Sequence, residues 1–111
     1  KLDSSGYAVV CNGATNIPVG VLQNNPTANQ SAEIVVVGLT KVSTDAALAI
    51  GNLIGTSADG QADAKTVGTD TTEYVVGVAM VTSGAADTIT TAMVTCANPH
   101  RAASFQTTNR R

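Results

Sequence analysis

Aromatic residues are almost missing from this chain of 111 residues, which has no Trp, one Phe and two Tyr. Large aromatic side chains supply much of the buried area in most protein cores. The core must therefore be built from smaller residues, chiefly Ala and Val. At roughly 25 cal/mol per Å² of buried apolar surface, such a core leaves a thin margin over the entropy of ordering the chain. We expect tight sheet packing and oligomerisation to compensate.

Charged residues are also scarce, at 13% of the chain, which is low for a freely soluble monomer and indicates a surface in contact with something else. Their distribution is uneven, because residues 1–97 hold all eight carboxylates whereas residues 98–111 hold three arginines and no acid. Three arginines without a run are few for nucleic-acid binding, since each phosphate contact needs its own cation. We therefore expect no direct nucleic-acid partner.

The sequence shows no group of residues with the spacing of a catalytic triad or a metal site. His100 is the only histidine, and no Cys or carboxylate lies near it in sequence to complete a triad or a metal site. The acids of the predicted turns lack the alternating spacing of a calcium loop. Those acids are Asp59, Asp63, Asp70, Glu73 and Asp87. We predict no enzymatic activity, no cofactor and no metal. No apolar run approaches the about 20 residues of a membrane helix, so no membrane partner is expected either.

The two cysteines, Cys11 and Cys96, lie near opposite ends of the chain. In a secreted protein they could form one bridge that closes a long loop. In a reducing compartment they would be small buried hydrophobic residues. Each follows an apolar run, which favours the second interpretation, but the sequence leaves the pairing open.

Short runs rich in Val, Thr and Ile alternate with Gly, Asn and Asp, which is typical of β-structure. The Asp59-Gly60 pair predicts a hairpin turn, and the segment 43–50 predicts a short helix or a wide loop. The strand candidates are residues 7–11, 17–22, 32–42, 52–55, 61–64, 74–81 and 88–97. We predict an all-β domain over residues 1–97, a small barrel or sandwich of seven to eight short strands.

The tripeptide Val-Gly-Val occurs twice, at residues 19–21 and 76–78. Each copy lies in an apolar run that is followed by a polar turn and then by a second strand candidate. The repeat predicts a small closed β-structure built from two similar halves. The glycine at the centre of each copy is expected to allow close approach of a neighbouring backbone.

The strand pattern ends at Asn98-Pro99, and residues 98–111 are predicted to form an extended basic arm. Phe105 lies in this arm between Arg101 and Arg110. A lone aromatic in a polar tail is either without significance or an anchor whose ring fills a partner's pocket while arginines pair with an acidic rim. The candidate partner-binding residues are His100, Arg101, Phe105, Arg110 and Arg111.

Several motifs, taken in order, resemble the small head-decoration (capsid cement) proteins of tailed bacteriophages. Val-Gly-Val-Leu-Gln-Asn-Asn-Pro is followed by a polar loop and by Ala-Glu-Ile-Val-Val-Val-Gly-Leu-Thr-Lys-Val. Ala-Ile-Gly-Asn-Leu-Ile with Asp-Gly-Gln-Ala resembles the family's next hairpin, and Val-Gly-Val-Ala with Asp-Thr-Ile-Thr resembles its final one. The resemblance covers roughly residues 8–95, so the arm lies outside it.

The resemblance implies a non-enzymatic virion protein that is assembled in the host cytoplasm and binds the exterior of an expanded capsid. The implied partner is the major capsid protein, and the implied state is a homotrimer at three-fold or quasi-three-fold positions. Such proteins clamp neighbouring capsomers against the pressure of the packaged DNA. The family has no catalytic residues to carry over to this chain.

A second hypothesis comes from a different class, a secreted or surface β-sandwich binding module of the adhesin or carbohydrate-binding type. Sugar binding usually relies on exposed aromatic side chains, and this chain has three aromatics in all. A disulfide between Cys11 and Cys96 would favour this module, whereas free thiols would favour assembly in the cytoplasm.

Overall fold

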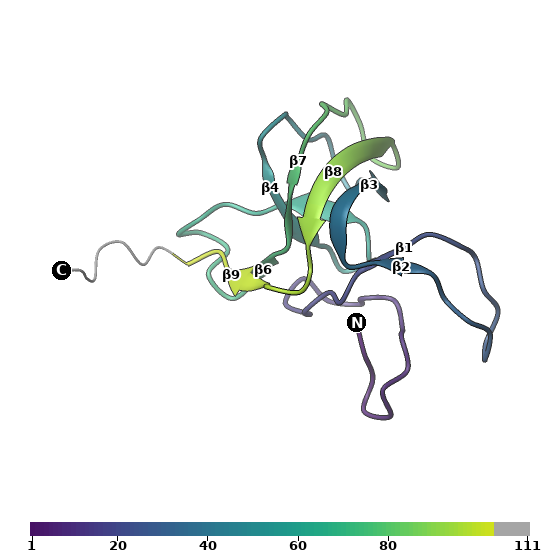
Figure 1. Cartoon of the computed structure of the whole chain (residues 1–111). Coiled ribbons are helices and arrows are strands. Elements are labelled where there is room, and N and C mark those ends of the chain that lie inside the picture. Colours follow the sequence, from purple (N-terminus) through teal and green to yellow (C-terminus); the bar gives the residue numbers. More distant parts are fainter. Residues whose placement is uncertain (104–111) are drawn as a thin grey trace.

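The computed structural model describes residues 1–103, which hold nine short β-strands and no helix. Five of the strands form one antiparallel sheet, and the other four form two separate two-stranded pairs (Figure 1). The strands are β1 (Val21–Leu22), β2 (Ile34–Val35), β3 (Val37–Ser43), β4 (Leu53–Thr56), β5 (Ala62–Ala64), β6 (Tyr74–Val75), β7 (Gly77–Ala79), β8 (Ile89–Thr95) and β9 (His100–Arg101). The all-β prediction is confirmed. The layers fit a sandwich, and no closed barrel is found among these strands.

The central sheet has the strand order β3-β8-β7-β4-β5. Its longest pairing joins β3 to β8 over seven residue pairs, from Val37↔Thr95 to Ser43↔Ile89. The predicted hairpin at Asp59-Gly60 is confirmed, because β4 and β5 pair antiparallel around it. Gly60 has a φ of 84°, a left-handed conformation that glycine adopts without strain.

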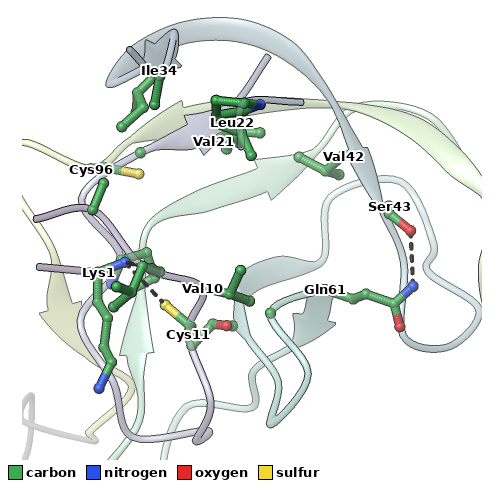
Figure 2. Close-up of a pocket in the computed structure, with 18 of the residues that line it drawn as sticks. Lys1, Val10, Cys11, Val21, Leu22, Ile34, Val42, Ser43, Gln61 and Cys96 are labelled. Atoms are coloured by element: carbon green, nitrogen blue, oxygen red, sulfur yellow. Dashed lines mark hydrogen bonds between the residues drawn. The ribbon is translucent and has the colours of Figure 1, made fainter. Parts of the chain in front are cut away.

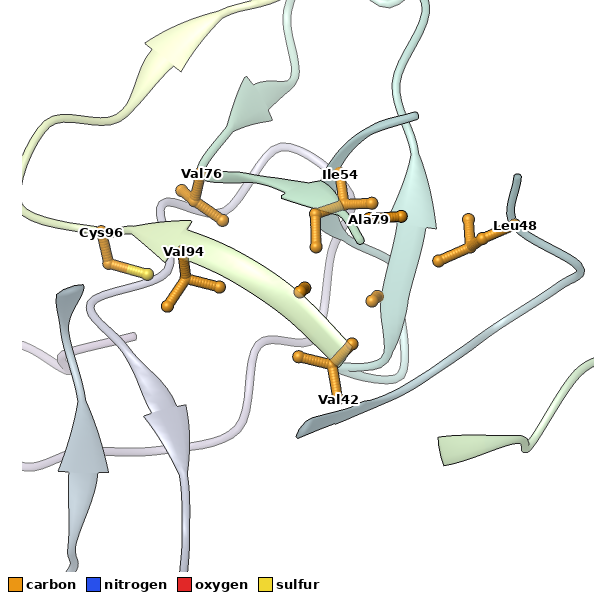
Figure 3. Close-up of a cluster of buried hydrophobic side chains, with 9 residues drawn as sticks. Val42, Leu48, Ile54, Val76, Ala79, Val94 and Cys96 are labelled. Atoms are coloured by element: carbon orange, nitrogen blue, oxygen red, sulfur yellow. The ribbon is translucent and has the colours of Figure 1, made fainter. Parts of the chain in front are cut away.

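Residues on the inner face of this sheet form the core (Figure 3). The period-two alternation of a strand places Thr90, Ala92 and Val94 of β8 inward and exposes Ile89, Met93 and Thr95. Leu48, from the loop between β3 and β4, closes one end of the core and is 1% exposed. The segment 43–50, predicted as a short helix or a wide loop, is therefore a loop.

Each Val-Gly-Val copy leads into a strand of an antiparallel pair. Val21 belongs to β1, which pairs with β2, and Gly77 begins β7, which pairs with β8. A Cβ on Gly20 would lie 2.9 Å from the Val35 carbonyl oxygen, and one on Gly77 would lie 2.4 Å from the Met93 carbonyl oxygen. The predicted close backbone approach is confirmed. The two pairs belong to different sheets, so the copies do not build two equivalent halves.

We expect Gly77→Ala to destabilise the fold by about 1–3 kcal/mol, because the new methyl group would overlap a strand backbone that cannot rotate away. Gly84→Ala is the matched control, since a Cβ added there would meet no atom within 4 Å and the φ of Gly84 is not positive. Urea unfolding measures both variants. Equal stabilities would show that the approach at Gly77 is not a packing constraint.

The N-terminal part of the chain departs from the predicted strands. Residues 7–11 form no strand, and of the candidate 17–22 only Val21–Leu22 pair, with β2. Backbone hydrogen bonds in this part stay local, as from the Asp3 nitrogen to the Tyr7 carbonyl oxygen, 2.9 Å apart. Figure 1 shows the segment looping away from the central sheet. Residues with a strand-like sequence pattern form no ladder of hydrogen bonds where no partner strand lies beside them.

The C-terminal boundary also differs from the sequence prediction. The sequence predicts an arm from Asn98, but the turn after β8 brings the chain back, and β9 pairs antiparallel with β6 through Tyr74↔Arg101 and Val75↔His100. Ala102 is 1% exposed, and its nitrogen donates to the Glu73 carbonyl oxygen at 2.9 Å. Residues 98–102 therefore belong to the folded body. Residues 104–111 of the predicted arm lie outside the described residues.

Candidate interaction surfaces

The outer face of the central sheet carries a continuous apolar row. Cross-strand pairing aligns Leu39 of β3 with Met93 of β8, Met93 with Val78 of β7, and Val78 with Leu53 of β4. Leu39 is 60% exposed and Met93 is 38% exposed, and the other two are half-buried. We call these four residues the outer apolar row. It spans four adjacent strands on the face opposite the core.

Exposed apolar side chains outnumber buried ones throughout the described residues. Six Val, Leu or Ile side chains are buried, whereas fifteen large apolar side chains are at least 38% exposed. The buried six are Val42, Leu48, Ile54, Val75, Val76 and Val94. Where exposed apolar side chains form a contiguous patch, that patch marks a contact site in soluble proteins. The thin core expected from the composition is thus accompanied by apolar surface that a partner could cover.

A cavity of about 1380 Å³ separates the N-terminal part of the chain from the inner face of the sheet (Figure 2). Ile54, Val76 and Val94 of the sheet side line it, and residues of the segments 6–11 and 18–34 line the other side. At its rim the Gln61 side-chain amide donates to Ser43 Oγ at 2.9 Å and to Asp87 Oδ1 at 2.7 Å. The N-terminal part therefore covers the core face loosely.

Both cysteines line this cavity as buried free thiols. Cys96 follows β8 and belongs to the core cluster, and Cys11 belongs to the N-terminal part. Burial raises the pKa of the Cys96 thiol, and the neighbouring Cys11 raises that pKa further. The prediction that both cysteines are buried is confirmed. That they line the same cavity could not be inferred from positions 85 residues apart in the chain.

Two of the five predicted partner-binding residues lie in the described part of the chain. His100 and Arg101 are adjacent and exposed on β9, and the Arg101 guanidinium lies 5.7 Å from the centre of the Tyr74 ring, a cation–π contact. The sequence does not indicate Tyr74 as a partner of this group. Phe105, Arg110 and Arg111 lie outside the described residues.

The buried Lys65 is a feature that the sequence did not indicate. Its side chain is fully covered, and its Nζ donates to the Thr56 carbonyl oxygen at 2.8 Å and pairs with Glu73, with Asp63 Oδ2 at 3.8 Å. A lysine is buried in this way only when its charge is paired. The pair ties the loop after β5 to the residue just before β6.

Carboxylates also gather at the loops beside β5. The pKa of Asp45 is raised, first by desolvation and then by the nearby charges of Asp59 and Asp63. The Ser57 hydroxyl bonds to the Asp59 carboxylate and lowers the pKa of Asp59. Within residues 1–103 no group of three or more His, Cys, Asp or Glu side chains is arranged to hold a metal ion.

Comparisons of the chain with protein-family models, with curated proteins and with solved structures find no match. The described residues also contain no helix long and apolar enough to cross a membrane.

Proposed function

We propose that this chain is a non-enzymatic structural protein that binds the outer surface of a phage capsid as a homotrimer and bridges neighbouring capsomers. The observation that carries the proposal is the outer apolar row, two exposed and two half-buried large side chains aligned across four strands of a domain whose core is thin. Such a domain gains stability from contact with its neighbours, because a partner that binds only the folded state stabilises it.

The distribution of exposed apolar residues supports contacts on more than one side. The outer apolar row lies on one face of the sheet, and the N-terminal part presents a second set that includes Tyr7, Val10 and Ile17. A protein that both self-associates and clamps a capsid needs two such surfaces. The order of motifs that resembles head-decoration proteins runs through both, over residues 8–95.

The secreted or surface binding module keeps one observation in its favour, the shared cavity of Cys11 and Cys96. A bond between them would suit an oxidising compartment. The aromatic side chains that usually form a sugar platform are not gathered in residues 1–103, where Tyr7 and Tyr74 lie in separate segments.

Co-sedimentation with expanded capsids of the phage that encodes the chain tests the proposal. We expect saturable binding by a species with three times the 11.1 kDa chain mass, measured by light scattering. A chain ending at Ala103 and the 111-residue chain are compared, so that β9 is retained and only residues 104–111 of the predicted arm are removed. Capsids that sediment without the 111-residue chain would contradict the proposal.

A further inference from the structure

The N-terminal segment, residues 1–20, is attached to the rest of the molecule at very few points. Each hydrogen bond of its described atoms stays inside the segment, as from the Val9 nitrogen to the Lys1 carbonyl oxygen at 2.8 Å. Only Cys11 and Pro18 are buried among its residues. Cys11 is therefore a main point at which side-chain packing holds the segment.

The segment contacts the turn between β4 and β5 at Val10 and Cys11. A Cβ on Gly60 would lie 2.6 Å from Val10 Cγ1 and 3.3 Å from the Cys11 carbonyl oxygen. The glycine thus lets the segment lie directly on the turn, which places the Cys11 side chain at the edge of the cavity (Figure 2).

Cys96 faces the same cavity from the central sheet. It follows β8, its backbone nitrogen donates to the Val36 carbonyl oxygen at 2.8 Å, and its side chain packs in the core cluster. Its position is fixed by the longest strand pairing of the fold. The chain thus holds one thiol directly after the longest strand pairing and the other on a loosely held segment, with both on one cavity and both free.

We propose that Cys11 and Cys96 form a reversible disulfide that locks the N-terminal segment onto the central sheet. The oxidant is a small-molecule disulfide such as oxidised glutathione. The Cys11 thiolate attacks one sulfur of the oxidant and releases one glutathione thiolate, which leaves a mixed disulfide on Cys11. The Cys96 sulfur, after losing its proton to solvent, attacks the Cys11 sulfur and releases the second glutathione.

The consequence is a segment whose attachment depends on the redox state of its surroundings. In a reducing compartment the thiols persist and the segment is held by packing alone. In an oxidising medium the bond closes a long loop and removes the open conformations of the segment. The inference concerns two residues of the chain itself, so it does not rest on the proposed function.

The pKa of Cys96 affects the rate of this reaction rather than its outcome. Because burial keeps the Cys96 thiol protonated, the second step depends on transient release of its proton. The bond is thus expected to form faster at higher pH. The direction follows because the thiolate, and not the thiol, is the attacking species.

The test treats the complete native chain with oxidised glutathione and measures intact mass without reductant. We expect the mass to fall by two hydrogen atoms with no glutathione retained and no link between chains. Cys11→Ser and Cys96→Ser are the matched controls, and each is expected to retain one glutathione. Three outcomes would contradict the proposed disulfide. They are a stable glutathione adduct on the native chain, a dimer linked between chains, and thiols that react only after unfolding.

Amide hydrogen exchange over residues 8–20 tests the locking. We expect exchange in the oxidised chain to be at least about 10-fold slower than in the reduced chain, because opening of the segment is suppressed. Reduction by dithiothreitol should restore the original rate. A bond that forms and leaves the exchange rate unchanged would overturn the lock. The comparison uses the native sequence in both states, so no variant has to fold.

Discussion

Replacing Leu39 by Lys and Met93 by Glu together is expected to weaken capsid binding by roughly 1000-fold. Two anchors of about 2 kcal/mol each correspond to that loss at about 1.4 kcal/mol per tenfold change. The two positions are directly opposite in the β3–β8 pairing. The new charges therefore attract each other across the strands, which preserves the sheet, and the net charge of the chain is unchanged.

The matched control is Val67→Lys with Ile50→Glu. These side chains are 48% and 69% exposed and lie outside the outer apolar row, and the pair introduces the same two charges. We expect capsid binding and trimer mass to stay within about 2-fold of the native chain, since scattered surface apolar residues contribute little. Native-like binding by the Leu39 and Met93 variant would exclude the outer apolar row as a contact surface, whether between copies or with the capsid.

Glu73→Leu is expected to lower the free energy of unfolding by about 3 kcal/mol, because it leaves the buried Lys65 ammonium without its main partner. Asp63 Oδ2, at 3.8 Å from Lys65 Nζ, compensates only in part. The double variant Lys65→Met with Glu73→Leu removes both charges and is expected to recover most of the loss. Urea unfolding at neutral pH measures the series.

Glu33→Leu is the control for this series, because Glu33 is exposed and its carboxylate takes part in no ion pair within the described residues. Its effect should stay within about 0.5 kcal/mol. If Glu73→Leu were as mild as this control, the Lys65 ion pair would not stabilise the loop between β5 and β6.

Local signals in the sequence predicted the parts of the fold that are built from neighbouring segments. The Asp59-Gly60 turn specified the β4–β5 hairpin, and the run rich in Thr, Ile and Val at residues 88–97 indicated the strand β8. The N-terminal candidate strands carried similar patterns but have no partner in the sheet. Pairing depends on residues far away in the chain, so an alternating pattern alone cannot establish it.

The candidate surfaces were harder to predict because β8 inverts the usual distribution of residue sizes. Its inward positions hold Thr90 and Ala92, whereas the larger Ile89 and Met93 point outward. A sequence pattern places large apolar residues in the core by default. The outer apolar row became evident only from the register of four strands.

The buried Lys65 and the Arg101–Tyr74 contact were missed for related reasons. A lysine is mostly exposed, so the sequence gives no reason to bury Lys65. Its partner Glu73 is eight residues away, outside any helical or strand spacing that would suggest a pair. Arg101 meets Tyr74 through the pairing of β6 with β9, which the expected arm at residue 98 obscured.

The measurement that tests the central claim most directly is the temperature at which DNA-filled capsids release their DNA, with and without the native chain. A protein that bridges capsomers adds contacts that must break before the shell opens. We therefore predict release at a clearly higher temperature when the chain is bound, and no such increase with the Leu39 and Met93 variant. Identical release temperatures at saturating native chain would contradict the capsid-stabilising function.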